Sequence, residues 1–246
     1  MRPGAFDYVV LVVILLAAIF DWRWYWPRYV RSIRANMPGA RMRMYRNVVV
    51  AEWVVTLYVL GLWVAKARPW SALWLGPVSP LRSGIGFFVA AIIIALLLLQ
   101  ARKVKKVLAR PEAVVRLRKQ VAADLLAPAT SGERRAFWFV SITAGICEEI
   151  VFRGFLMWLI AAWTGLALAV IISSILFGCA HAYLGAAHVP KTAIVGLVLA
   201  LVVVACGSLW PAIVIHAALD LNGGELGFRI KRAPSASSEA TPSPTS

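Results

Sequence analysis

Residues 84–100 read GIGFFVAAIIIALLLLQ, a stretch without a single charged side chain. The hydrocarbon core of a bilayer is about 30 Å thick, and roughly 20 apolar residues of helix are needed to cross it. This stretch therefore predicts a transmembrane helix. Two further stretches have the same character, YVVLVVILLAAIF within residues 6–21 and VVVAEWVVTLYVLGLWVA at residues 48–65.

Four more apolar stretches follow, and each of them is interrupted by polar residues. They cover residues 136–162, 166–184, 191–207 and 208–224. Together the stretches predict an all-α, polytopic membrane helix bundle of about seven transmembrane helices, with six or eight as the alternatives if the region near residues 68–80 divides differently. We expect three parts, which are N-terminal transmembrane helices with basic interfacial loops (1–135), a core of four spans (136–224) and a disordered Ser/Pro-rich tail (225–246).

The composition of the whole chain supports a membrane protein. Of its 246 residues, 61% are hydrophobic and 15% are charged, which excludes an ordinary soluble domain. The net charge is +15, and on a soluble chain such a charge would indicate nucleic-acid binding. Most of the basic residues lie in two connections between spans, 22–47 and 101–135. The expected partner is therefore the lipid membrane, and no nucleic acid is expected.

The basic connections also predict the orientation of the chain. Cytoplasmic loops of membrane proteins carry an excess of Lys and Arg. With both connections in the cytoplasm, the N-terminus lies outside and seven spans bring the basic residues 229–232 to the cytoplasmic side. We therefore expect an integral, multi-pass protein of the cell (inner) membrane. The apolar residues of both connections recur every three or four positions, which fits either surface helices on anionic lipid or solvated basic loops.

Ionisable side chains inside the spans are the candidates for chemistry. A charged group at the bilayer centre costs at least about 2.5 to 3.5 kcal/mol on insertion scales, so each needs a partner or a function. Glu149 and Arg153 are four residues apart and can form an ion pair, while Glu148, about 100° round the helix, points elsewhere. His216 and Asp220 have the same four-residue spacing and can hydrogen-bond.

Several other polar residues have simpler interpretations. Glu52 lies one turn into its span beside Trp53, and we expect it to be an interfacial carboxylate. The cysteines Cys147, Cys179 and Cys206 are odd in number and lie in apolar runs, so they predict small buried residues and not a disulfide framework. Thr130 and Glu133, directly before the fourth span, predict a capping box at the start of a helix.

Three motifs in the second half of the chain resemble those of one family. CEEIVFRGFL at 147–156 resembles the EExxxR motif of the CPBP (CAAX protease and bacteriocin-processing, Abi) intramembrane proteases, whose best-known type is the Rce1-like CAAX prenyl protease. FGCAH at 177–181 resembles the family's FxxxH motif, and HAALD at 216–220 resembles its HxxxN or HxxxD motif. The resemblance covers about residues 136–224.

This resemblance implies an intramembrane endopeptidase that hydrolyses a peptide bond of a membrane-associated or C-terminal peptide. Glu148 would be the general base that activates a water, and His181 would orient that water. His216 would donate to the oxyanion. An ionised Asp220 cannot itself donate a hydrogen bond, so it would instead hold the tautomer of His216 and favour the cationic form of that ring. Glu149 and Arg153 would form a structural ion pair, with a share of Glu149 in catalysis left open.

Two alternatives remain open in the sequence. Glu148, His181, His216 and Asp220 would be a sufficient ligand set for a catalytic zinc ion, although their spacing does not resemble HExxH, and the same groups would also suffice for a metal-free glutamate protease. The second alternative is a non-catalytic membrane protein of the same fold, such as a bacteriocin immunity factor, scaffold or chaperone. In that case the polar cluster would serve helix packing only.

Overall fold

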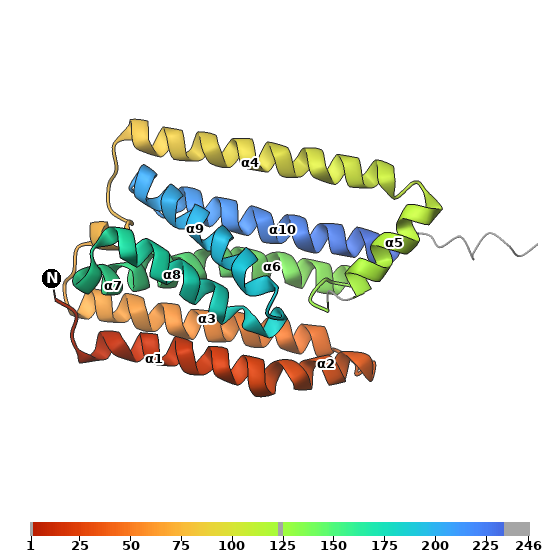
Figure 1. The fold of residues 1–246 in the computed structure, drawn as a ribbon, viewed down its shortest axis with the longest axis horizontal. Helices are drawn as coiled ribbons and strands as arrows, with labels where there is room; N and C mark the ends of the chain where they lie inside the picture. The colour runs from red at the N-terminus through yellow and green to blue at the C-terminus, as the bar shows by residue number, and fades with distance from the viewer. Residues whose placement is uncertain (1, 123–124, 234–246) are drawn as a thin grey trace, which may run out of the picture.

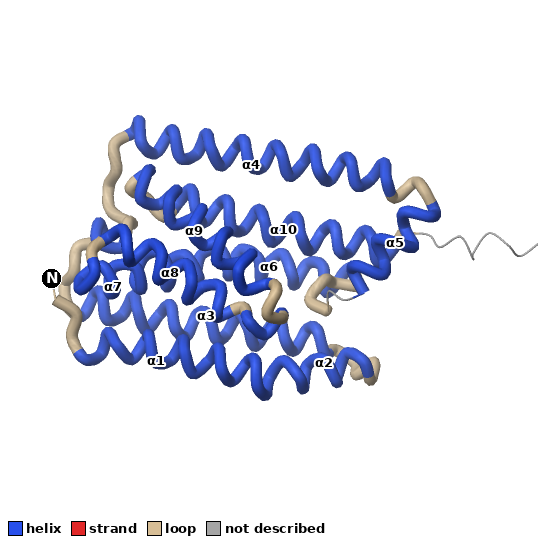
Figure 2. The backbone as a smooth tube through the Cα atoms, viewed as in Figure 1, coloured by secondary structure: helices blue, strands red, loops and turns tan. Residues whose placement is uncertain are grey.

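A computed structural model describes residues 2–122 and 125–233 of the chain. Within these residues every regular element is helical, and the long helices lie side by side along a common axis (Figures 1 and 2). Four helices are long and apolar enough to cross a membrane: Ala5–Arg34, Ala40–Ala65, Pro80–Val107 and His188–Cys206. The predicted all-α membrane helix bundle is confirmed.

The N-terminal part of the chain forms the outer helices. Its elements are α1 (Ala5–Phe20), the π-helix η1 (Asp21–Tyr25), α2 (Trp26–Arg34), α3 (Ala40–Ala65), the 3-10 helix η2 (Trp70–Leu73), α4 (Pro80–Val107) and α5 (Pro111–Ala122). The predicted spans 6–21, 48–65 and 84–100 correspond to α1, α3 and α4.

The C-terminal part forms the remaining helices and the centre of the bundle. Its elements are α6 (Ser131–Glu148), the π-helix η3 (Glu149–Leu156), α7 (Met157–Thr164), α8 (Leu166–Ala180), the 3-10 helix η4 (Ala182–Leu184), α9 (His188–Cys206) and α10 (Trp210–Arg232). α6, η3 and α7 follow one another without a break, so the described residues hold one continuous helix for each of the seven predicted spans. α6 packs against α3 and against α10, which places it between the two parts of the chain.

The structure differs from two of the predicted boundaries and contains one of the two surface helices considered for the basic connections. The connection 22–47 does not begin with a separate surface helix, because η1 carries the helix of α1 directly into α2. The second basic connection, 101–135, does contain a helix: α5 lies at an angle to the long helices and contacts α10 (Figure 1). α10 continues past residue 224 to Arg232 because Phe228 and Ile230 are buried against the bundle, and residues 234–246 of the predicted tail lie outside the described part.

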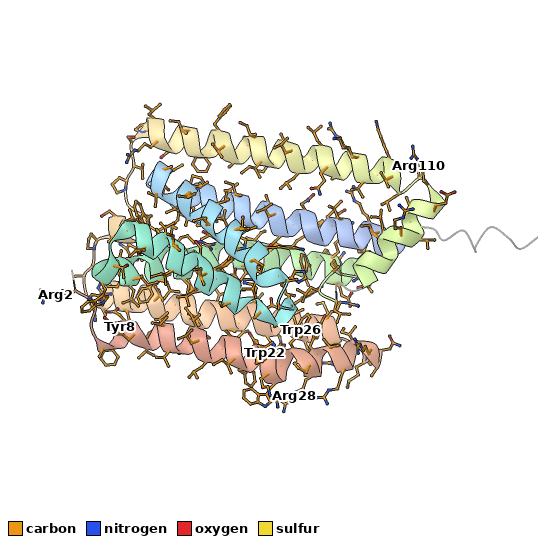
Figure 3. The ribbon with its side chains drawn as sticks, in the orientation of Figure 1. Arg2, Tyr8, Trp22, Trp26, Arg28 and Arg110 are labelled. Carbon is orange, nitrogen blue, oxygen red and sulfur yellow. The ribbon has the colours of Figure 1, made fainter. Side chains whose placement is uncertain are left out.

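The two ends of the bundle differ in charge. The end of α2, the start of α3, the end of α4, α5 and the end of α10 lie together at the right of Figure 1. These segments carry most of the basic residues, and Figure 3 shows Arg110 at this end and Arg2 at the opposite one. We call this the basic end. The charge difference on which the predicted orientation depends is therefore present in the fold.

A buried ion pair stabilises the end of the bundle opposite the basic end. Asp7 is fully buried and accepts hydrogen bonds from Nη1 and Nη2 of Arg68 at 2.8 and 2.7 Å. The guanidinium of Arg68 lies over the rings of Trp63 and Trp158, 5.0 and 4.5 Å from their centroids. Such bidentate pairs between Arg and carboxylate combine charge with fixed geometry. The start of α1 is thereby joined to the end of α3 and to α7.

The helix that carries the acidic motif begins with the predicted capping box. The Thr130 hydroxyl accepts from the Glu133 backbone N–H at 3.1 Å, and the Glu133 carboxylate accepts from the backbone N–H of Thr130 at 3.2 Å. This confirms the capping box and satisfies backbone donors that the first turn of a helix otherwise leaves without partners. The cysteine prediction is confirmed for Cys147 and Cys206 and wrong for Cys179, which is exposed.

A glycine sets the distance between α6 and α10. A Cβ at Gly145 would lie 2.9 Å from Cβ of Ala217 and 3.0 Å from the carbonyl oxygen of Ile213. Only glycine therefore lets the two helices approach this closely, as is common where membrane helices pack. This approach brings Glu148, near the end of α6, next to His216 on α10.

We expect Gly145→Val to lower the free energy of unfolding by about 2 kcal/mol or more, because the added side chain overpacks the α6–α10 contact. Gly61→Ala is the matched control, since a Cβ at Gly61 meets no atom within 4 Å. It should stay within about 1 kcal/mol of the parent. Denaturant unfolding in detergent measures both, and equal midpoints for the two variants would contradict the close approach.

Candidate active site

The acidic motif lies where the central helix changes from α-helix to π-helix. α6 ends at Glu148, and η3 begins at Glu149. π-helical turns are wider than α-helical ones and occur frequently at functional sites. Every residue of η3 is buried. Glu148 and Glu149 both lie near His216, at 3.7 and 2.8 Å from its ring nitrogens, whereas the prediction had them point in different directions.

His216 is the residue on which the acidic side chains converge. Its Nδ1 lies 2.8 Å from Oε1 of Glu149, and because a carboxylate only accepts, Nδ1 donates this hydrogen bond. Its Nε2 lies 3.7 Å from Oε2 of Glu148 and 3.8 Å from Oδ2 of Asp220. These two distances exceed hydrogen-bond length. The prediction that Asp220 holds the His216 tautomer is therefore wrong, and Glu149 is the residue that does so.

The predicted ion pair between Glu149 and Arg153 is present and fully buried. Nη1 of Arg153 donates to Oε1 of Glu149 at 2.7 Å. The guanidinium also lies over the Phe177 ring, with 4.1 Å between its central carbon and the ring centroid. Gly196 on α9 leaves room for it, since a Cβ there would lie 3.0 Å from Nη2 of Arg153. The pair thus compensates one buried carboxylate and fixes the position of Glu149.

His181 approaches Glu148 from the end of α8. It is the C-cap residue of this helix, and its Nδ1 lies 2.9 Å from the carbonyl oxygen of Phe177. A carbonyl only accepts, so Nδ1 donates and Nε2 is the nitrogen that faces the site. Nε2 lies 3.9 Å from Oε1 of Glu148. The four-residue spacing of the FxxxH motif therefore both fixes the ring of His181 and directs it toward Glu148.

Glu148 is the site carboxylate that lies between the two histidines. Its oxygen atoms face His181 on one side and His216 on the other. Oε2 is inaccessible to solvent and accepts no hydrogen bond from any described residue. The side chain as a whole keeps 18% of its surface exposed, and that of Asp220 beside it keeps 41%. Glu148 is therefore placed to accept a proton from a molecule that enters the site.

Glu52 lies near this site, and sequence reasoning missed its place there. The residue is partly buried, its Oε2 is inaccessible and without a hydrogen bond to the described residues, and it lies within electrostatic range of Glu148 and Asp220. The prediction of an interfacial carboxylate gave Glu52 no place beside the site. Thr56, one turn further on the same face of α3, is fully buried and meets Cys147 on α6, so this face of α3 is turned into the bundle.

The zinc alternative finds no ligand set in the described residues. No group of three or more His, Cys, Asp or Glu side chains there is arranged to hold a metal ion. Zinc needs its ligands at about 2.0 to 2.3 Å. Nδ1 of His216 is used by Glu149 and Nδ1 of His181 by the Phe177 carbonyl, an arrangement that is also typical of histidine ligands of metals, and Nε2 of the two rings lies 3.7 and 3.9 Å from the nearest oxygen of Glu148.

Comparison with known proteins supports the interpretation of the motifs. Residues 131–222 match the family model described as type II CAAX prenyl endopeptidase Rce1-like. The match begins at the first residue of α6, ends within α10, and contains all three motifs. It confirms the family resemblance for this part of the chain. No curated protein and no solved structure matches the chain significantly.

We expect Arg153→Met to lower the free energy of unfolding by about 3 to 5 kcal/mol, because it leaves Glu149 buried without its cationic partner. The double variant Glu149→Gln/Arg153→Met should lose less than Arg153→Met alone, since no buried charge then remains unpaired. Arg28→Met on the exposed face of α2 is the control and should have almost no effect. Unfolding in detergent gives all three values, and a loss below about 1 kcal/mol for Arg153→Met would exclude a structural role for the pair.

Proposed function

We propose that the protein is an intramembrane endopeptidase of the CAAX prenyl endopeptidase type, which hydrolyses a peptide bond with a water activated by Glu148. The observation that carries the proposal is the position of Glu148 between His181 and His216, with one oxygen that accepts no hydrogen bond from a described residue. The match of residues 131–222 to the Rce1-like family supports the same reaction class.

In the first step Glu148 acts as general base. A water beside Oε1 of Glu148 and Nε2 of His181 can donate one proton to each, since these acceptors are 3.9 Å apart. Glu148 takes one proton as the water oxygen attacks the carbonyl carbon of the scissile bond. A positioned general base of this kind contributes about 10²- to 10⁴-fold to the rate.

His216 stabilises the negative charge that develops on the carbonyl oxygen. Glu149 accepts from Nδ1–H, and the carboxylates of Glu148 and Asp220 lie within 4 Å of Nε2, an environment that favours a second proton on the ring. Nε2–H then donates to the oxyanion. Glu148 returns its proton to the leaving amine, so that the products are a carboxylic acid and an amine, which end as carboxylate and ammonium in water, and the enzyme regains its starting state.

The substrate enters, we propose, from the basic end, which faces the cytoplasm. The turn that joins α8 to α9 stops short of that end of the bundle (Figure 1), and Asp220, which lies one turn from His216 toward the same end, is the most exposed of the carboxylates that contact a site histidine. Basic loops favour the cytoplasmic side and bind anionic lipid. A membrane-associated or C-terminal peptide can reach the site along this route without crossing the bilayer.

A non-catalytic role of the same fold explains less of the geometry. Helix packing accounts for Glu149, Arg153 and His216, which hydrogen-bond to one another, although Oε2 of Glu149 and Nη2 of Arg153 have no partner among the described residues. It gives no reason for Glu148, whose partly exposed side chain lies between His181 and His216 and has no cationic Arg or Lys as partner among the described ion pairs. An uncompensated carboxyl group in a membrane protein is costly and is retained where function needs it.

We predict that Glu148→Gln lowers kcat by about 10³-fold or more on a peptide that the parent cleaves, because the amide cannot accept the proton of the water. The purified parent and variant are compared on vesicles that carry a membrane-anchored peptide with a prenylated C-terminal tail. Thermal unfolding should show equal midpoints for the two proteins. Cleavage by Glu148→Gln at the rate of the parent would overturn the proposal.

We also predict that a chelator leaves cleavage by the parent unchanged, since the described residues provide no metal ligand set. The purified protein is treated with EDTA or 1,10-phenanthroline, dialysed and assayed on the same vesicles. Loss of cleavage that added zinc restores would show that the reaction is metal-dependent and that Glu148 acts through the metal.

A further inference from the structure

A chain of aromatic rings connects the site to the N-terminal helix. The ring of His181 contacts Phe177, with 4.8 Å between centroids, and Tyr183, with 6.0 Å. Tyr183 in turn contacts Trp26 at the start of α2, with 5.1 Å between centroids. Contacts at these distances hold ring orientations and contribute beyond simple burial.

The backbone around His181 does little to fix the orientation of its ring, so the side chains packed beside it matter. It is the C-cap of α8, outside the regular α-helix, and a short 3-10 turn follows it. The hydrogen bond to the Phe177 carbonyl fixes one ring nitrogen. The plane of the ring, and with it the direction of Nε2 toward Glu148, depends on what packs beside it, and Tyr183 lies nearly parallel to it with 28° between the two planes.

Tyr183 is itself held in place by the first helix of the chain. η4, which carries Tyr183, contacts the π-helix η1, and Asp21 of η1 lies within electrostatic range of the Tyr183 hydroxyl.

The three tryptophans of η1 and the start of α2 face different directions. Trp22 and Trp24 are 58% and 46% exposed, whereas Trp26 is partly buried. Figure 3 shows Trp26 on the side of α2 that faces the bundle and Arg28 on the side that faces away from it. Trp26 is thus the tryptophan of this segment that reaches a residue next to the site.

We infer that Tyr183 and Trp26 are positioning residues for His181, so that the helix formed by α1, η1 and α2 is part of the active site although it lies outside the family match. The inference rests on the proposed function for its catalytic consequence alone. Its structural content, the orientation of the His181 ring, can be measured without any substrate.

The test uses the full-length protein labelled with ¹⁵N-histidine. The chain has three histidines, so the ring signals of His181 are identified by their loss in His181→Asn. Trp26→Ala should shift the His181 signals and leave those of His188 and His216 in place, which also shows that the fold is intact. Trp26→Phe, which restores a ring, should return them toward the parent. Trp24→Ala is the matched control and should shift none of them.

The same variants have an expected effect on catalysis. Trp26→Ala should lower kcat about five- to tenfold with little change in KM, since loss of one ring contact misdirects the water and not the peptide. If Trp26→Ala fails to fold, Tyr183→Leu serves as the truncated variant and Tyr183→Phe as the conservative one.

Two outcomes overturn the inference. In the first, the His181 signals of Trp26→Ala, or of Tyr183→Leu, coincide with those of the parent. In the second, the conservative variant, Trp26→Phe or Tyr183→Phe, shifts them as far as the truncated one. If the signals move as expected while the parent cleaves no peptide, the positioning of His181 stands and the proposed protease function fails.

Discussion

One carboxylate oxygen holds the two halves of the site together. Oε1 of Glu149 accepts from Nη1 of Arg153 at 2.7 Å and from Nδ1 of His216 at 2.8 Å. The first contact lies within η3, and the second joins η3 to α10. In an apolar bundle neither the carboxylate nor the guanidinium is stable without the other. Their pairing therefore anchors the acidic motif and fixes the tautomer of His216, while Glu148 lies outside this pair, between His181 and His216.

The packing of the other helices allows the close approach that this contact needs. Gly145 lets α6 approach α10, and Gly196 makes room for the Arg153 guanidinium beside Phe177. The N-terminal helices contribute as well, because α3 brings Glu52 toward Glu148 and α2 brings Trp26 to Tyr183. The site is thus built from both parts of the chain, although the Rce1-like match covers the second part alone.

Much of this could be predicted from the sequence because it depends on residue spacing and hydropathy. Long uncharged stretches predict spans, and the four-residue spacing of Glu149 and Arg153 predicts their ion pair. The fold and the family resemblance followed from these patterns. The assignment of Asp220 as the partner of His216 was wrong for a physical reason. The four-residue spacing of His216 and Asp220 gave no information on the Glu149 carboxylate, which reaches Nδ1 of His216 from another helix at 2.8 Å while Asp220 lies 3.8 Å from Nε2. Glu52 and Trp26 were missed because contacts between distant helices depend on how those helices pack.

The protonation of the His216 ring tests the central contact most directly. In protein labelled with ¹⁵N-histidine, we predict that Nδ1 of His216 carries a proton in the parent at neutral pH and that its signal shifts in Glu149→Ala. A His216 ring whose Nδ1 carries no proton, or whose signal is the same with and without the Glu149 carboxylate, would contradict the arrangement on which the site depends.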